Sequence, residues 1–152
     1  MNPWLVYKPA INLVGIPLQD GALSKHYDAL WDALSARYAE IPYADPDQGY
    51  GLHCLNSVEP TYLAALAVNK IGVVPDGMAA KMLPANTYAV FSHHGLSEDL
   101  LQTVDRIFSK WLPGSSYQLA GDFYLENYDD RFQPGSAESV VSIYVPVIEQ
   151  PT

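Results

Sequence analysis

One glutamate in a tyrosine-rich, strand-like segment is the residue of this sequence best placed to do chemistry. Glu126 lies between Tyr124 and Tyr128 in the segment 123–128, and the strand period of two turns these side chains toward one face. We expect the two tyrosines to pack against the sheet. A carboxylate among aromatic and apolar neighbours is strongly disfavoured unless a positive group meets it. That group can be an Arg or Lys of the protein, a proton, or a cationic ligand, and its identity decides the function.

Plainer interpretations of Glu126 stay open from the residues alone. The carboxylate can pair with Arg131, Lys81 or Arg106, or it can lie exposed on a solvated strand face. The aromatic residues raise a similar question, because the 11 Tyr, 3 Trp and 4 Phe of the chain can line a pocket or simply pack a core.

Composition and charge bound what the chain can do. Its 152 residues are 49% apolar and 16% charged, which predicts one globular domain over residues 1–152 with a sizeable core. The 8 basic and 17 acidic residues give a formal net charge of −9, which disfavours direct contact with nucleic acid and with anionic membrane surfaces. The N-terminus has no signal-peptide pattern and no apolar run reaches about 18 residues, so we expect a cytoplasmic protein.

Familiar catalytic and metal-binding motifs are absent from the sequence. The single cysteine, Cys54, excludes an intramolecular disulfide and is interpreted as a core thiol. His93 and His94 are adjacent, so in a strand they face opposite ways and predict no metal site. No phosphate-binding glycine loop is present, and we expect neither a metal nor a cofactor.

Hydrophobic periodicity predicts strands and two helices. Apolar, β-branched runs predict strands at 10–18, 50–55, 61–68, 87–92, 123–128 and 140–147. A helix over 22–40 is predicted from a stripe at spacings of three and four, whose members are Leu23, Tyr27, Leu30, Leu34 and Tyr38, with Trp31 beside it. A second helix, capped by Ser97 and ended by Pro113-Gly114, presents Leu100, Val104, Ile107, Phe108 and Trp111. The segments 42–49 and 74–84 are expected to be loops.

The order of these elements repeats. Strand, helix, strand, strand occurs once over about residues 8–69 and again over about 84–148. Two such units usually pair into one antiparallel sheet with both helices on one face, an α+β fold with pseudo-two-fold symmetry. The groove between the two helices, above the sheet, is then the natural concave site.

Several segments, taken in order, carry a family resemblance. In the second half they are TYAVFSHHG (87–95), IFSKWLP (107–113), FYLENYDDRFQP (123–134) and SIYVPV (142–147). In the first half VGIPL, ALWDAL and YGLHC match more loosely. Together they resemble the GyrI-like superfamily, which includes the effector-binding domains of AraC-type and MerR-type multidrug regulators. The resemblance covers nearly the whole chain and implies the same duplicated strand–helix–strand–strand fold.

The resemblance also implies a pocket and a ligand class. The family pocket typically holds a buried glutamate, at the position that Glu126 occupies in LENYD, and several members bind bulky lipophilic cations. Tyr144 in SIYVP matches a pocket tyrosine of some regulators. Further candidates for the pocket wall, assigned by element and expected facing, are Tyr88, Tyr62, Trp111, Trp31 and Phe108. The regulators also carry a helix-turn-helix region, whereas here the effector-like domain fills the chain, so we expect a stand-alone binding domain rather than an enzyme.

Two other functions remain as alternatives. Some GyrI-like proteins are hydrolases of strained, electrophilic small molecules, and Glu126 with Tyr88 or Tyr144 would form a general acid/base pair if the side chains met. Relatives of the fold have also been linked to inhibition of DNA gyrase, and a surface of charge −9 suits a basic protein partner.

Overall fold

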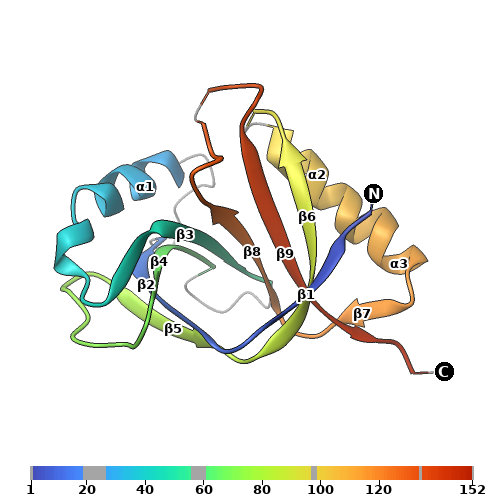
Figure 1. Cartoon of the computed structure of the whole chain (residues 1–152), viewed down its shortest axis with the longest axis horizontal. Helices are drawn as coiled ribbons and strands as arrows, with labels where there is room; N and C mark the ends of the chain where they lie inside the picture. Colours follow the sequence, from blue (N-terminus) through green and yellow to red (C-terminus); the bar gives the residue numbers. More distant parts are fainter. Residues whose placement is uncertain (1, 19–26, 56–60, 97–98, 134, 152) are drawn as a thin grey trace.

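The computed structural model describes residues 2–18, 27–55, 61–96, 99–133 and 135–151 (Figure 1). In chain order the elements are β1 (Trp4–Lys8), β2 (Ile11–Pro17), α1 (Tyr27–Ser35), the 3-10 turn η2 (Tyr38–Glu40), β3 (Ala44–Cys54), β4 (Tyr62–Val68), β5 (Ala79–Leu83), β6 (Asn86–His94), α2 (Leu100–Arg106), the π-helical stretch η4 (Ile107–Trp111), the short turn α3 (Leu112–Gly114), β7 (Tyr117–Leu119), β8 (Phe123–Tyr128) and β9 (Val140–Glu149).

The strands form one antiparallel sheet whose order is symmetric about its centre. The order is β1-β6-β9-β8-β3-β4-β2-β5, and β7 pairs with the end of β9. The unit β2-α1-β3-β4 corresponds to the unit β6-α2-β8-β9, element by element. Read from the β5 end, the first unit has the strand order β2-β4-β3, and read from the β1 end, the second has the equivalent order β6-β9-β8. The predicted duplication is therefore confirmed. The symmetry places β3 and β8 side by side at the middle of the sheet, where Gly51 lies opposite Glu126.

Both helices cover the same face of this sheet. The buried clusters beneath α1 and α2 contain Ala64 of β4 and Ile143 of β9, respectively. Ala64 and Ile143 belong to one cross-strand row, which runs through Gly51 and Glu126. Because cross-strand partners share a face, Glu126 points to the helical side, between the two helices. The predicted α+β fold with both helices on one face is therefore confirmed.

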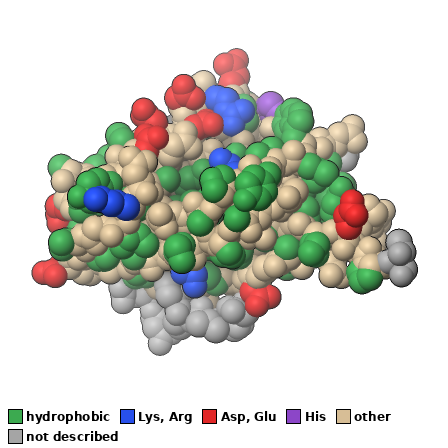
Figure 2. Space-filling view, turned by 60° about the horizontal axis from the view of Figure 1, so that its bottom comes forward, with side chains coloured by type: hydrophobic (Ala, Val, Ile, Leu, Met, Phe, Trp, Pro, Cys, Tyr) green, Lys and Arg blue, Asp and Glu red, His purple; other side chains and the backbone are tan. Residues whose placement is uncertain are grey.

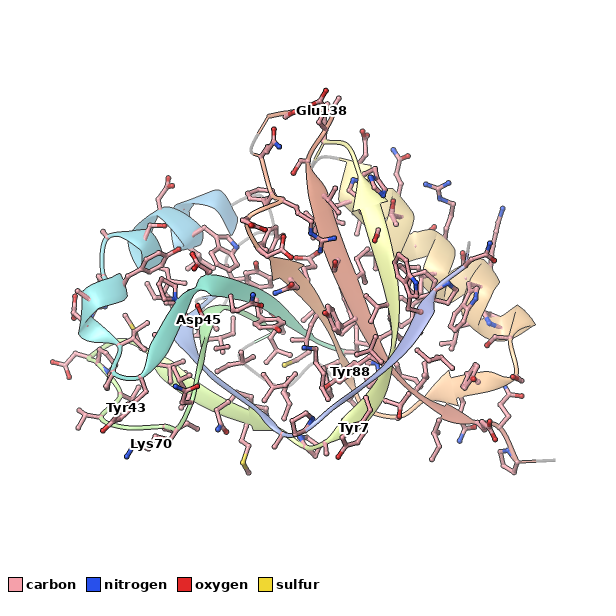
Figure 3. All side chains as sticks on the ribbon, in the orientation of Figure 1. Tyr7, Tyr43, Asp45, Lys70, Tyr88 and Glu138 are labelled. Atoms are coloured by element: carbon pink, nitrogen blue, oxygen red, sulfur yellow. The ribbon has the colours of Figure 1, made fainter. Side chains whose placement is uncertain are left out.

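The opposite face holds a separate core around which the sheet curls (Figure 1). Leu13 of β2 and Tyr88 of β6 belong to one buried cluster with Leu125, although four strands separate β2 from β6 in the sheet order. Figure 3 labels Tyr88, which is fully buried within this curl. Burial of these apolar side chains is the main stabilising contribution on this face.

The ends of the sheet differ from the prediction. β1 was not predicted, and β5 lies in the segment 74–84 that was expected to be a loop. Both are short end strands, and each pairs with one neighbour, β6 and β2 respectively. Several of their side chains, including Trp4, Tyr7 and Met82, are exposed. Figure 2 shows apolar side chains spread over the side of the molecule that is turned forward, with acidic side chains mostly around its margin.

The first half also departs from the prediction in detail. β3 begins at Ala44, because an irregular register between Asp45 and Gly49 keeps the expected loop residues within the strand. The helix expected over 22–40 is α1 over Tyr27–Ser35 followed by η2. Its buried residue Leu34 confirms the predicted stripe, whereas Leu23 lies outside the described residues.

The second helix is irregular but ends where predicted. α2 passes into the π-helical stretch η4 and stops at Gly114. The predicted cap Ser97 lies outside the described residues. Val104 and Ile107 are buried, as the stripe predicted. None of the helices described is both long and apolar enough to cross a membrane.

Candidate functional site

Glu126 lies at the centre of the sheet, on the face that the helices cover. The residue is only 5% exposed. Its cross-strand neighbour is Gly51, and the next row on this face pairs Tyr128 with Gly49. Two glycines on the same face of β3 leave room above the strand for the carboxylate and the surrounding rings. A Cβ atom at Gly51 would lie 2.7 Å from the Tyr62 hydroxyl and 3.0 Å from Glu126 Oε1.

The carboxylate of Glu126 accepts a hydrogen bond from a phenol and lies beside an imidazole. The Tyr128 hydroxyl donates a hydrogen bond of 3.0 Å to Glu126 Oε1. His53 Nε2 lies 3.1 Å from the same oxygen. Within the described part of the chain, no Arg or Lys lies within ion-pair distance of this carboxylate. Among the residues described, Glu126 therefore has no permanent cation as a partner.

The alternative ion-pair partners of Glu126 are engaged elsewhere or exposed. Arg131 forms an ion pair of 2.9 Å with Asp129 and donates to the Ser142 hydroxyl at 2.9 Å. Lys81 and Arg106 are both exposed to solvent. The interpretation of Glu126 as a partner of Arg131, Lys81 or Arg106 is therefore wrong, and so is its exposure on a solvated face.

Aromatic rings enclose the carboxylate. His53 stacks on Tyr124 with ring centroids 4.4 Å apart and an interplanar angle of 4°. The His53 ring also meets Tyr62 edge to face at 4.7 Å. From α1, the Trp31 indole N–H donates to the Tyr62 hydroxyl at 2.8 Å, and its ring meets Tyr128 at 5.1 Å. We call these five residues, His53, Tyr62, Tyr124, Tyr128 and Trp31, the aromatic frame.

Two further phenylalanines extend the aromatic frame on the side of the second half. Phe108 of η4 contacts Tyr124 with centroids 5.6 Å apart. Phe132, after β8, meets Tyr128 edge to face at 4.9 Å. The frame thus receives rings from both helical segments and from the central strands. Such an arrangement offers π faces and apolar walls around one carboxylate.

The structure brings together only part of the predicted site. Trp31, Tyr62 and Phe108 lie at or beside the aromatic frame, whereas Trp111 packs with Phe91 at 5.0 Å and Tyr117 at 6.3 Å in the core beneath α2.

Tyr88 and Tyr144 lie on the other face of the sheet. Tyr144 is the cross-strand partner of Leu125, and its ring lies 5.7 Å from that of Tyr88. Because alternate residues of a strand point to opposite faces, neither tyrosine can meet Glu126. The alternative in which Glu126 pairs with Tyr88 or Tyr144 is therefore wrong.

Sequence reasoning missed His53 and Gly51. Both come from GLHC, where the alternation of Gly51 and His53 places them on one face. That alternation does not indicate which distant strand pairs with this segment, so it does not place His53 beside Glu126. Tyr124 and Tyr128 were expected to pack the sheet, and Tyr128 in addition contacts the carboxylate.

The phenol of Tyr128 is a fixed donor. Burial, and then the negative charge of Glu126, hold its pKa well above 10. Tyr128 therefore stays protonated at neutral pH and can only donate to the carboxylate. A hydrogen bond of this kind, to an ionised acceptor, contributes more than a neutral one.

Replacing Tyr128 with Phe is expected to lower the free energy of unfolding by about 1.5 kcal/mol at neutral pH, because a buried carboxylate loses a donor while the ring contacts remain. Urea unfolding measures the change. Tyr7→Phe, at a residue that is 67% exposed, is the matched control and should change stability by less than about 0.5 kcal/mol. Equal effects of the two substitutions would contradict the hydrogen bond.

An open polar groove lies apart from the aromatic frame. Its volume is about 510 Å³, and its lining includes His93, His94, Asp99 and Arg106. His93 is buried and its ring nitrogens contact Thr103 Oγ1 at 2.7 Å and the Leu96 carbonyl at 2.9 Å, whereas His94 is exposed. His93 therefore ties α2 to β6. No cluster of potential metal ligands occurs among the residues described.

Comparison with known proteins identifies the family of this chain. The family model of the GyrI-like small molecule binding domain matches residues 1–148. The transcriptional regulator BrlR of Pseudomonas aeruginosa is 30% identical over 151 residues, which cover 97% of this chain and 56% of BrlR. The chain thus spans just over half the length of this relative.

Solved structures share the fold at lower identity. The crystal structure of the EcmrR C-terminal domain has a TM-score of 0.77 at 17% identity and covers 98% of both chains. The structure of SAV2435 bound to tetraphenylphosphonium has a TM-score of 0.70 at 18% identity, covering 97% of this chain and 94% of that one. The match of the family model over nearly the whole chain shows that this chain belongs to the GyrI-like small molecule binding domains.

Proposed function

We propose that this GyrI-like domain binds bulky lipophilic cations, with Glu126 as the counter-charge and the aromatic frame as the wall. The observation that carries the proposal is a carboxylate that is 5% exposed, enclosed by rings, and without an Arg or Lys partner in the described part of the chain. The relative SAV2435 was solved with tetraphenylphosphonium, a ligand of this chemical class, which supports the proposal.

The carboxylate supplies the preference for charge, and the rings supply tolerance of shape. A carboxylate about 4 Å from a cation contributes roughly 4 kcal/mol at an effective dielectric constant near 20, before desolvation is subtracted. Each ring face turned to the cation adds about 0.5–2 kcal/mol. Neutral analogues keep the contacts with the rings but lose the larger contribution.

Binding requires the aromatic frame to open. Glu126 is nearly inaccessible, the Trp31 indole N–H donates to the Tyr62 hydroxyl, and a Cβ added at Gly49 would lie 3.3 Å from the Trp31 ring. A bulky ligand must therefore separate Trp31 from its neighbours. Fluorescence of this tryptophan is expected to report binding directly.

The charge preference gives the test. Methyltriphenylphosphonium and triphenylphosphine oxide are similar in shape, but only the first is a cation. We expect the wild type to bind the cation more tightly, and Glu126→Gln to weaken cation binding about 30-fold, or about 2 kcal/mol, while leaving the neutral compound unchanged. Isothermal titration calorimetry measures both affinities.

Glu138→Gln is the matched control for this experiment. Glu138 is exposed and lies on the connection before β9 (Figure 3). Its replacement by Gln removes the same charge without touching the aromatic frame. Equal losses of cation affinity in Glu126→Gln and Glu138→Gln would mean that the effect arises from the net charge of the protein and not from Glu126. Equal affinity of the wild type for the cation and the oxide would refute the proposal.

Hydrolysis of an electrophilic ligand is a second candidate, favoured by one contact. The distance of 3.0 Å between Tyr128 and Glu126 lies within the reach that general acid/base catalysis needs. The raised pKa of Tyr128 keeps that phenol protonated, so it cannot serve as the base and Glu126 would have to activate the water. Incubation with a small epoxide, followed by product analysis, separates the functions: Glu126-dependent diol formation supports hydrolysis, and recovery of the epoxide supports binding alone.

A further inference from the structure

The imidazole of His53 already makes the kinds of contact that the proposed cationic ligand would make. It stacks in parallel on Tyr124 at 4.4 Å, meets the Tyr62 ring at 4.7 Å, and places Nε2 at 3.1 Å from Glu126 Oε1. These are a π face, an apolar wall and a counter-charge. The side chains of His53 and Glu126 are 13% and 7% exposed, respectively, so the pair is largely shielded from water.

We infer that His53 is a built-in competitor of the cationic ligand, and that its protonation makes cation affinity depend on pH. The inference rests on the proposed function, because it concerns the same carboxylate. A cation that approaches Glu126 must displace the imidazole from Oε1 or share that oxygen with it. The work of displacement depends on whether the imidazole is charged.

The charge of the imidazole sets the direction of the effect. Protonated imidazole donates a charge-assisted hydrogen bond to the carboxylate and neutralises it, whereas neutral imidazole leaves the negative charge available. Histidine side chains ordinarily change charge between roughly pH 5 and 8. Cation affinity should therefore be high at the upper end of this range and fall as the pH is lowered.

The phenols that contact His53 do not produce the same effect. They include Tyr124 of β8 and Tyr62 of β4. Phenols ordinarily lose their protons only near about pH 10. Protonation of Glu126 itself would also weaken cation binding, but that effect persists when His53 is replaced.

Tetraphenylphosphonium is a suitable probe because its charge is permanent, so any pH dependence arises in the protein. We expect the affinity of the wild type to fall at least about tenfold between about pH 8 and about pH 5.5. His53→Gln keeps a hydrogen-bonding side chain without a titrating charge, and its affinity should fall less than about threefold over the same interval. At the lower pH this variant should bind more tightly than the wild type.

His94→Gln is the matched control, since His94 is exposed and lies on β6 away from this carboxylate. It should keep the pH dependence of the wild type. His53→Phe, which retains stacking without a hydrogen bond, repeats the test if the Gln variant folds poorly. The same pH dependence in the wild type and in both His53 variants would overturn the role of His53.

A measurement without ligand separates this inference from the proposed function. In the protein with nitrogen-15-labelled histidine, the ring-nitrogen resonances of His53 should shift in Glu126→Gln at constant pH, because the carboxylate 3.1 Å from Nε2 is lost. Unchanged resonances overturn the pairing. Absence of tetraphenylphosphonium binding to every variant at both pH values would instead refute the proposed function and, with it, the competition.

Discussion

Gly51→Ala is expected to lower the free energy of unfolding by about 3 kcal/mol and to weaken cation binding more than tenfold. The new methyl group would lie 2.7 Å from the Tyr62 hydroxyl and 3.0 Å from Glu126 Oε1. Overpacking a tight interior typically costs about 1–3 kcal/mol. Displacing the Tyr62 hydroxyl also removes the acceptor of the Trp31 N–H, and an unmade buried hydrogen bond costs about 1–3 kcal/mol.

Denaturant unfolding and calorimetric titration measure the two effects of Gly51→Ala. Gly114→Ala is the matched control, because a Cβ atom at Gly114 meets nothing within 4 Å. If the two alanine variants behave alike, the close packing at Gly51 is refuted. A double mutant with Tyr62→Phe tests the contact itself: removing the hydroxyl should recover part of the loss, so the two substitutions should not be additive.

The position of Glu126 was predictable because the signal is local. The period of two in Tyr124, Glu126 and Tyr128 fixes their common face whatever the strand pairs with, and the structure confirms it. The two helical stripes and the repeated order of elements likewise follow from short-range patterns. These features were sufficient to predict the central strands of the sheet and its two helices.

The composition of the site was less predictable, because it depends on register between distant strands. His53 and Glu126 are far apart in sequence, and only the pairing of Leu52 with Leu125 sets them on one face and in contact. A shift by one residue would have turned the whole of β3 to the other face. The same argument explains Tyr144, which the pairing with Leu125 sends to the far side.

The end strands and the start of β3 were missed for another reason. β5 has the sequence AAKML, whose residues carry little intrinsic strand preference, and its pairing with β2 decides its conformation. The residues Asp45 to Gln48 favour turns by type, but they lie within β3 because its pairing with β4 resumes at Gly49. Tertiary pairing outweighs local preference at both places.

Raising the pH above about 10 is expected to unfold the domain steeply, because buried tyrosines must stay protonated in the folded state. Burial raises the pKa of Tyr50, Tyr88, Tyr128 and Tyr144 above the usual 10, and for Tyr50 the neighbouring phenols of Tyr144 and Tyr88 raise it further. Since the folded pKa lies above the unfolded one, the stabilisation is fully present below about pH 10 and is lost as the pH rises.

The steepness of alkaline unfolding follows from the number of retained protons. Each such tyrosine lowers the free energy of unfolding by up to about 1.4 kcal/mol per pH unit, as long as the unfolded chain has lost the proton and the folded chain keeps it. The loss of stability therefore steepens with each phenol that stays protonated in the folded state. Tyrosinate absorbance should therefore rise in a step that coincides with the loss of the circular dichroism of the sheet.

Tyr50→Phe measures how much one buried tyrosine contributes to the loss of stability at high pH. The residue is 4% exposed and lies in the core opposite the helices, where its ring meets that of Tyr144 at 6.4 Å. Its replacement should reduce the slope of stability against pH by about 1.4 kcal/mol per unit, whereas Tyr7→Phe, at a residue 67% exposed, should leave the slope unchanged. Gradual ionisation of all tyrosines with the circular dichroism intact would contradict the expectation, because it would mean that the buried phenols reach water without unfolding.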